Sequence, residues 1–241
     1  MPDTALEIRD LTREVTQQGE PRRIVDGFTF TFNTGGKYVI LGPSGSGKTS
    51  LLRLINRLDE RTGGEIIFGG HDTHDHPPCE LRRKIAYLFQ TPHVIQGSMG
   101  DNLRFADDSI SKGEMKRLLH QVQLAAFDID SSAANLSTGE KQRLALARLL
   151  ATEPAVILLD EPTAALDPSR TEAIESLIRS LVEDHQLTVL MVSHDPQQAL
   201  RIGGEALLMV EGRLIEHGPV SRIVNDPQTD LGRRYRDKEL S

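Results

Sequence analysis

A glycine-rich run in the first quarter of the chain has the residue types and spacing that bind nucleotide phosphates, because it fits G-x-x-x-x-G-K-[ST]. Its glycines let successive backbone N–H groups turn inward around a phosphate, and the helix that follows adds its positive dipole end. Lys48 would reach the β- and γ-phosphate oxygens, and the Thr49 hydroxyl would be a ligand of Mg²⁺. A turn that only caps a helix is disfavoured, because strand, loop, Lys-Thr pair and helix occur in order. The residues predicted to contact the nucleotide are Gly42, Pro43, Ser44, Gly45, Ser46, Gly47, Lys48, Thr49 and Ser50.

Two adjacent carboxylates follow an apolar run later in the chain. Ala155–Leu159 has the composition of a buried parallel strand, and Asp160 and Glu161 come directly after it. Open α/β sheets place their ligands at the carboxyl ends of the strands, so Asp160 would hold Mg²⁺ through water. Glu161 would orient or deprotonate a water for in-line attack on a γ-phosphate. Two surface acids at a strand end are the alternative, which the glycine-rich loop in the same chain disfavours.

A polar segment, Asn135–Arg143, lies between these two elements. Ser137 followed by Glu140 has the spacing of a helix capping box, which alone would explain the segment. Together with the other two motifs, however, the Leu-Ser-Thr-Gly-Glu run at 136–140 resembles the signature of ABC proteins, usually Leu-Ser-Gly-Gly-Gln. Over nearly its full length the chain resembles the ATP-binding subunit of an ABC transporter.

The resemblance implies roles for three further sites. Gln90 matches the Q-loop glutamine, which touches Mg²⁺ and the attacking water and links to a helical insertion. Ala165-Leu166-Asp167 matches the D-loop, and His194 matches the switch histidine that contacts the γ-phosphate. Singly, Gln90 and His194 would be ordinary polar residues at strand ends, and their order in one chain favours the family roles. The implied catalytic residues are Lys48, Gln90, Glu161 and His194, and the implied ligands of Mg²⁺ are Thr49, Gln90 and Asp160.

Family behaviour also implies that one chain carries only half of each site for ATP. Two ATPase subunits, as a homodimer or a heterodimer, would pack head to tail, with ATP between the P-loop of one and Ser137 and Gly139 of the other. The signature helix would direct a second helix dipole at the γ-phosphate. Asp167 is also predicted to contact the nucleotide. A monomer should therefore hydrolyse ATP poorly.

The resemblance further implies that the chain energises transport through a separate membrane-spanning partner. Even runs such as Ala155–Leu159 are far shorter than the roughly 18 residues that cross a bilayer. We expect the chain to lie peripherally at the cytoplasmic face of the inner (cell) membrane, with the permease docked near residues 91–105. Met99 and Leu103 are the candidate contacts there, although packing inside the helical insertion explains both equally well.

The run from Gln90 to Leu103 most resembles small ATPases of the iron-export and plant aluminium-tolerance type, and phosphate-importer ATPases share part of it. The expected cargo is a metal ion or phosphate. An alternative within the family is an ATPase that acts mechanically on a membrane partner in cell division or lipoprotein release. DNA-repair and translation members carry long coiled coils or two ATPase domains, which do not fit in 241 residues. A P-loop kinase or GTPase would not need the segment Leu136–Glu140.

Three positions depart from the family pattern. Position 138 is Thr where Gly is usual, and position 140 is Glu where Gln is common. Val15 occupies the place where the family usually has an aromatic ring against adenine. We therefore expect weak base stacking, or a contribution from Arg13, Arg22 or the partner, and poor discrimination between ATP and GTP.

A histidine-rich segment after the first motif invites comparison with metal sites, because imidazole and carboxylate at close spacing are good ligands. The favoured interpretation is a polar loop, since no regular strand or helix fixes ligand geometry there. The residues concerned are His71, Asp72, His74, Asp75, His76 and Cys79.

The elements that position these motifs alternate between strand and helix, which predicts a largely parallel, helix-covered sheet. The expected fold is α/β, and the resemblance specifies a P-loop NTPase core with a mainly parallel sheet, an N-terminal antiparallel β subdomain and an inserted α-helical subdomain. We expect one ABC ATPase domain over 1–241, with core and β subdomain in 1–90 and 135–225, the helical insertion in 91–134 and a solvated charged tail in 226–241. Expected strands are 6–11, 28–32, 38–41, 65–68, 85–89, 155–159, 187–192 and 206–210, and expected helices are 48–58, about 118–124, from 137, about 169–182 and after 195.

Composition agrees with an ordinary globular protein of between one and two domains. The chain has 241 residues, a net charge of −7 and 38% hydrophobic residues, and its N-terminus lacks a signal-peptide pattern. The acidic balance and the absence of Trp argue against a nucleic-acid partner. The single cysteine, Cys79, fits a reducing compartment.

Overall fold

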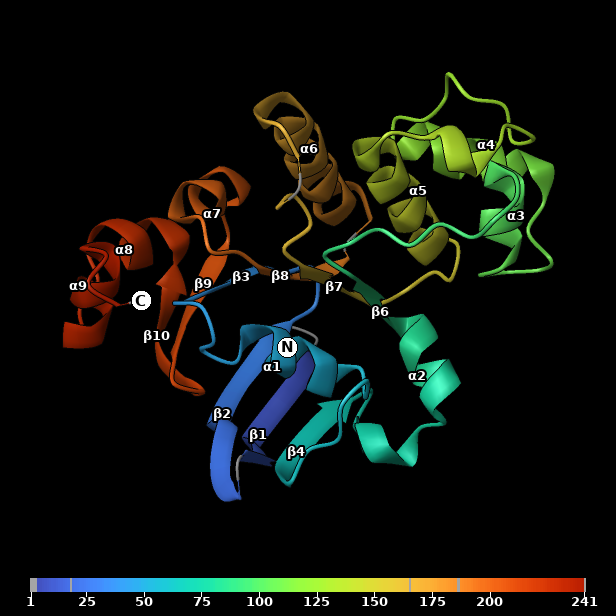
Figure 1. Cartoon of the computed structure of the whole chain (residues 1–241). Coiled ribbons are helices and arrows are strands. Elements are labelled where there is room, and N and C mark those ends of the chain that lie inside the picture. Colours follow the sequence, from blue (N-terminus) through green and yellow to red (C-terminus); the bar gives the residue numbers. More distant parts are fainter. Residues whose placement is uncertain (1–3, 18, 165, 186, 241) are drawn as a thin grey trace.

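The computed structural model describes residues 4–17, 19–164, 166–185 and 187–240, which build two β-sheets and the helices around them (Figure 1). The first sheet is antiparallel, with strand order β2-β1-β4-β5. Its strands are β1 (Thr4–Gln17), β2 (Glu20–Asn33), β4 (Gly63–Phe68) and β5 (His71–Asp72). The predicted N-terminal antiparallel sheet is therefore confirmed, and β1 and β2 extend beyond the expected strands because they form one long hairpin around residue 19.

The second sheet carries the predicted alternation of strands and helices. Its order is β10-β9-β3-β8-β7-β6, parallel throughout except for β10 against β9. The strands are β3 (Lys37–Leu41), β6 (Ile85–Leu88), β7 (Val156–Asp160), β8 (Thr188–Val192), β9 (Glu205–Val210) and β10 (Arg213–Pro219). Strands β6, β7 and β8 are wholly buried, as expected for a parallel sheet covered on both faces.

The helices are α1 (Lys48–Ile55), α2 (Pro78–Lys84), α3 (Met99–Arg104), α4 (Lys112–Gln121), α5 (Thr138–Leu150), α6 (Pro168–His185), α7 (Pro196–Ile202), α8 (Val220–Asn225) and α9 (Asp230–Arg236), with short 3₁₀ turns at Thr73–Asp75 and Ala133–Asn135. Most helices flank the second sheet, whereas α3 and α4 lie beyond α5, against which they pack (Figure 1). Within the described residues, no helix is both long and apolar enough to span a membrane.

Two hydrophobic cores lie on opposite faces of the parallel sheet, because side chains alternate along each strand. Tyr38 and Ile40 of β3 pack in one core with α1 and the inner face of the antiparallel sheet, so α1 lies between the two sheets. Val39 and Leu41 face the other core, to which helices α3 to α8 contribute buried side chains. The loop between β3 and α1 is thus fixed at both ends by buried elements.

The helical insertion consists of α3 and α4 packed against α5 (Figure 1). Each begins at a serine that accepts a hydrogen bond from a backbone N–H, Ser98 for α3 and Ser111 for α4. The helix expected at about 118–124 therefore begins earlier and ends at Gln121. The limits 91–134 stay a prediction.

Within the expected charged tail, Asp230–Arg236 form helix α9, which the sequence did not predict. Its arginines are exposed, but Tyr235 and, beyond the helix, Leu240 pack against the second core. The cause lies in the buried carboxylate of Glu216, which accepts hydrogen bonds from the backbone N–H groups of Gln228 and Thr229. That carboxylate fixes the chain just before α9. The charged composition of the tail gives no sign of this contact.

Candidate functional site

The glycine-rich loop joins β3 to α1, as predicted, and two of its glycines are required by their neighbours. A Cβ on Gly42 would lie 2.0 Å from the carbonyl oxygen of Met209, and one on Gly47 would lie 2.3 Å from that of Ile24. Both have positive φ, 148° and 97°, where side-chain-bearing residues are strained. Gly47 is also the N-cap of α1, so the loop presents backbone N–H groups at a helix N-terminus.

Lys48 lies folded over this loop with its ammonium group almost fully paired. Its Nζ donates to the carbonyl oxygens of Gly42 at 2.9 Å and Pro43 at 2.6 Å, and to Ser46 Oγ at 3.2 Å. Burial lowers the pKa of Lys48, and the nearby carboxylates of Glu161 and Asp160 oppose that shift. A partly desolvated cation beside a loop that ends at a helix N-terminus suits a phosphate, which would replace the loop oxygens as its partner.

Both carboxylate oxygens of Asp160, at the end of β7, are occupied by hydroxyl donors. Thr49 Oγ1 donates to Oδ1 at 2.9 Å, and the phenol of Tyr87 donates to Oδ2 at 2.8 Å. Burial, together with the Asp160 charge, raises the pKa of Tyr87, so the phenol stays protonated and acts as donor. The Thr49 hydroxyl and the Asp160 carboxylate are oxygen donors of the kind that Mg²⁺ prefers, so the donor set fits that ion.

Tyr87 is the residue of this group that the motifs did not predict. It stands in the apolar run of β6, where a tyrosine has the pattern of a core aromatic. Parallel pairing aligns β6 with β7, with Leu88 opposite Leu159, and this register could have shown that Tyr87 lies near Asp160.

The structure brings three predicted catalytic side chains together. Glu161 Oε2 accepts a hydrogen bond of 3.3 Å from Gln90 Nε2, and its Oε1 lies 3.4 Å from Nδ1 of His194. Glu161 itself has φ of 46°, in the left-handed region that non-glycine residues seldom adopt. Its backbone N–H donates to the carbonyl oxygen of Val192 at 3.3 Å, which fixes it to the end of β8. A strained backbone held by its surroundings is common where a side chain must be aimed at a reacting group.

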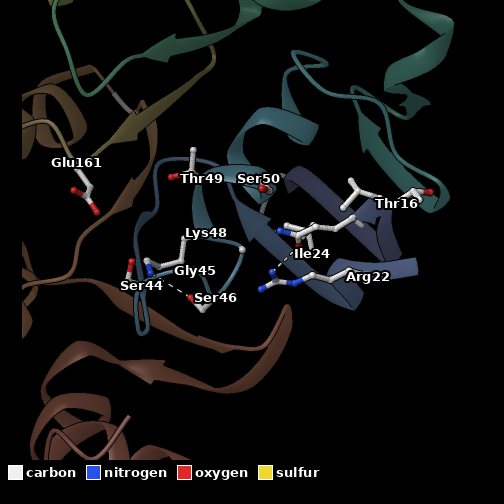
Figure 2. A pocket seen from close by; sticks show the side chains of 13 residues that line it. Thr16, Arg22, Ile24, Ser44, Gly45, Ser46, Lys48, Thr49, Ser50 and Glu161 are labelled. Atoms are coloured by element: carbon white, nitrogen blue, oxygen red, sulfur yellow. Dashed lines mark hydrogen bonds between the residues drawn. The ribbon is translucent and has the colours of Figure 1, made fainter. Parts of the chain in front are cut away.

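A cleft of about 590 Å³ runs from the P-loop to the hairpin of β1 and β2 (Figure 2). Its P-loop end is polar, and Glu161 lines its edge. At the other end lie Val15 and Ile24, with Arg22, which donates to Gln17 Oε1 at 2.9 Å. Among the described residues that line the cleft, none has an aromatic side chain, and Val15 lies at the hairpin end.

Ser137, Gly139 and Asp167 do not line this cleft. Ser137 caps α5 as predicted, accepting from the backbone N–H of Glu140 at 3.4 Å while the Glu140 carboxylate accepts from the Ser137 backbone N–H at 2.8 Å. Asp167 forms an ion pair of 3.2 Å with Arg170, whose Cδ would lie 3.2 Å from a Cβ on Gly139. These residues form a second group, at the N-termini of α5 and α6. Ala165 of the predicted D-loop lies outside the described residues.

The histidine-rich segment has protein partners. Asp72 accepts two hydrogen bonds of 2.9 Å from Arg61, and His74 Nε2 lies 2.8 Å from a Glu60 carboxylate oxygen. Across the part of the chain that the structure describes, no three His, Cys, Asp or Glu side chains gather as metal ligands would. The segment is nevertheless not an irregular loop, because His71–Asp72 form strand β5 against β4 and Thr73–Asp75 form a 3₁₀ turn.

Around the expected permease contact, Met99 and Leu103 are fully buried in the second core. The packing interpretation therefore holds for both residues. The exposed apolar side chains of this region are Phe89 and Phe105, with exposed fractions of 44% and 74%. Neither was singled out from the sequence.

Comparisons with known proteins agree with this geometry. The family profile described as "ABC transporter" matches residues 25–164. The chain is 39% identical to ABC transporter I family member 17 of Arabidopsis thaliana, over 88% of this chain and 81% of the relative. It is 40% identical to the phosphate import ATP-binding protein PstB of Thermotoga maritima, over 81% of this chain and 84% of the relative.

A solved structure has the same fold. It is described as the dimeric post-hydrolysis state of the ATP-binding cassette MJ0796 bound to ADP and Pi, with a TM-score of 0.77, 28% identity, and coverage of 89% of this chain and 98% of that one. Fold and site together define an ATP-binding cassette. The chain belongs to the ABC transporter family, as an ABC ATPase nucleotide-binding domain.

Proposed function

We propose that the cleft between the P-loop and the β1–β2 hairpin binds ATP for hydrolysis. The observation that carries the proposal is Glu161, which lies at the edge of the P-loop cleft within 3.3 Å of Gln90 and 3.4 Å of His194. Lys48 would leave its loop oxygens for the β- and γ-phosphates. Val15, Ile24 and Arg22 would face the base.

Glu161 is the proposed general base. Its carboxylate would accept a proton from the attacking water, while the Gln90 amide fixes one carboxylate oxygen and His194 approaches the other. Thr49 and Asp160 would hold Mg²⁺, with Gln90 as a further ligand, and the ion would neutralise charge on the β- and γ-phosphates. A general base is aimed by its neighbours, so the Gln90 and His194 contacts give Glu161 its direction.

The proposed working unit is a head-to-tail pair of ATPase subunits. Ser137, Gly139 and Asp167 lie apart from the cleft of their own chain, yet they form one group at two helix N-termini. Helix N-termini attract anions, so this group would close on the γ-phosphate held by a second subunit. The neighbouring MJ0796 structure is described as a dimer, which supports this arrangement.

The proposed role of the pair is to drive transport through a separate membrane-spanning permease at the cytoplasmic face of the membrane. Exposed Phe105 closes α3 within the segment 91–105 proposed for docking, and exposed Phe89 precedes Gln90. Large exposed aromatic side chains are enriched at protein interfaces. Phosphate is the cargo that one relative's name favours, since PstB is described as a phosphate import protein, and a metal ion is the other candidate.

The test is ATP turnover by the purified chain and by Glu161→Gln, each with Mg²⁺. We expect the variant to bind ATP with unchanged affinity and to lose at least about a hundredfold in turnover, because a general base contributes roughly 10²–10⁴-fold. Turnover within a factor of two of the wild type would overturn the assignment.

For the permease, Phe105→Ser should weaken co-purification of the membrane partner without changing basal ATP turnover.

A further inference from the structure

A buried glutamine links the loop that carries Glu161 to the loop that carries His194. Gln198, on α7, has an exposed fraction of 5%. Its Oε1 accepts from Ser193 Oγ at 2.7 Å, and its Nε2 donates to Thr163 Oγ1 at 2.6 Å and to a Glu175 carboxylate oxygen at 3.2 Å. Both ends of one amide are thus in use.

The partners of Gln198 stand beside the proposed catalytic residues in the chain. Thr163 follows Glu161 by two residues, and Ser193 directly precedes His194. Glu161, Thr163, Ser193, His194 and Gln198 also line one cavity of about 180 Å³. Any rotation of the Gln198 amide would therefore disturb hydrogen bonds to both loops.

Glu175 fixes which way the amide faces. Its carboxylate is 1% exposed and is held by Arg201 through hydrogen bonds of 2.7 and 2.8 Å. A carboxylate only accepts, so the NH₂ group of Gln198 must face it and the amide oxygen must face Ser193. The hydrogen-bond pattern then has one orientation.

Stability alone is the competing explanation for this cluster. The Arg201–Glu175 pair already joins α7 to α6, so those two helices keep a direct link without Gln198. Gln198 adds the two contacts that the ion pair lacks, those to Thr163 and Ser193. Its distinctive connection is therefore between the two loops.

We propose that Gln198 is a positioning residue that holds the loops of Glu161 and His194 at one fixed spacing. The proposal rests on the proposed roles of Glu161 and His194 in ATP hydrolysis. Rotation of either loop would change the 3.4 Å approach between their side chains. Small misplacements of groups around a reacting centre cost rate far more than they cost ground-state binding. Gln198 should therefore affect turnover and leave the P-loop contacts to ATP unchanged.

The central variant is Gln198→Leu, which keeps similar volume and removes the amide. We expect kcat for ATP hydrolysis to fall about tenfold to a hundredfold, while the dissociation constant for ATP, measured on the same preparation, changes by less than about twofold. Gln197→Leu is the matched control, because Gln197 is the exposed neighbour on the same helix. It should keep wild-type kcat.

Two variants of the partners of Gln198 protect the test against a fold defect in Gln198→Leu. Thr163→Val removes the Thr163 contact, and Ser193→Ala removes the Ser193 contact together with the hydrogen bonds between Ser193 Oγ and Asp195. Thr163→Val and Ser193→Ala should each lower kcat with unchanged ATP affinity, and thermal unfolding monitors stability. In a His194→Ala background, adding Gln198→Leu should cost less than it does in the wild type, because residues that act as a unit are non-additive.

Equal losses of kcat and ATP affinity, or kcat unchanged in all three variants while the wild type turns over ATP, would overturn the positioning role. A wild-type chain that hydrolyses no ATP would instead contradict the proposed function.

Discussion

The phenol of Tyr87 and the hydroxyl of Thr49 hold opposite oxygens of the same carboxylate, that of Asp160, at 2.8 and 2.9 Å. The Asp160 side chain therefore cannot rotate without losing a hydrogen bond. This contact joins three elements, the P-loop helix, β6 and β7, at the point where the proposed Mg²⁺ site lies.

We predict that Tyr87→Phe lowers the free energy of unfolding by about 2 kcal/mol, because a hydrogen bond to a charged group is lost. The Mg²⁺ concentration that gives half-maximal ATP turnover should rise, since only Thr49 then orients the Asp160 carboxylate. A Mg²⁺ titration of turnover, with denaturant unfolding on the same samples, measures both. Tyr38→Phe is the control, because the Tyr38 phenol oxygen accepts from the Asn33 backbone N–H away from Asp160. An unchanged Mg²⁺ dependence in Tyr87→Phe would show that the tyrosine only stabilises the fold.

The hairpin end of the cleft, where the base would lie, predicts weak discrimination between ATP and GTP. With Val15 in place of a ring, we expect ATP and GTP to compete for the chain with affinities within about tenfold of each other, because stacking is worth about 1–3 kcal/mol per base. Val15→Tyr should tighten binding of both nucleotides, and Arg22→Ala should weaken it. Displacement of a fluorescent nucleotide measures the ATP and GTP affinities of the wild type and both variants. A preference for ATP of well over tenfold in the wild type would contradict the prediction.

Thr138 opens α5 beside Ser137 and its side chain is exposed. An extra branched side chain next to a phosphate-facing loop restricts close approach, so Thr138→Gly should leave ATP turnover intact or raise it. The glycine should cost less than about 1 kcal/mol of stability, since the position is at the helix terminus. Turnover at saturating ATP is the measurement. A large loss would show instead that the threonine contributes to the site.

Glu216 gives a prediction about acid stability. Burial raises the pKa of this carboxyl, but its hydrogen bonds and the nearby cation outweigh burial, so the pKa lies below its ordinary value. The groups that lower it are the backbone N–H groups of Gln228 and Thr229, the Thr229 hydroxyl and Arg222. A depressed carboxyl pKa contributes stability above the unfolded-state pKa of about 4.3, and that contribution is lost as pH falls through the folded-state pKa. Glu216→Gln should therefore be less stable by about 2 kcal/mol at pH 7.

The difference between the wild type and Glu216→Gln should persist to about pH 5 and shrink at more acidic pH. Urea unfolding across this range measures it, with Glu172→Gln as the control for an exposed carboxylate on α6. A difference that grows on acidification would contradict the assignment.

The parts of the site that the sequence predicted are those whose geometry is local. The P-loop is one continuous strand, turn and helix, and Asp160 with Glu161 end one buried strand, so their positions follow from nearby residues. Gln90 and His194 were placed by resemblance, and the structure brings both to Glu161.

Tyr87 and Gln198 were missed for a physical reason. Tyr87 meets Asp160 73 residues away, and Gln198 meets Thr163 and Glu175 at separations of 35 and 23. Neither belongs to a motif with fixed spacing. Helix α9 was not predicted because exposed arginines dominate the composition of the tail, whereas the position of the helix depends on Glu216, which lies in β10.

The most direct test of the account is whether ATP turnover requires two subunits. The measurement is the specific rate of ATP hydrolysis against protein concentration, with the mass of Glu161→Gln determined with and without Mg²⁺-ATP. We predict a specific rate that rises with concentration, and an ATP-dependent shift of Glu161→Gln to twice the chain mass of 26.7 kDa. Steady turnover at a constant specific rate by a species that remains at 26.7 kDa would contradict the account.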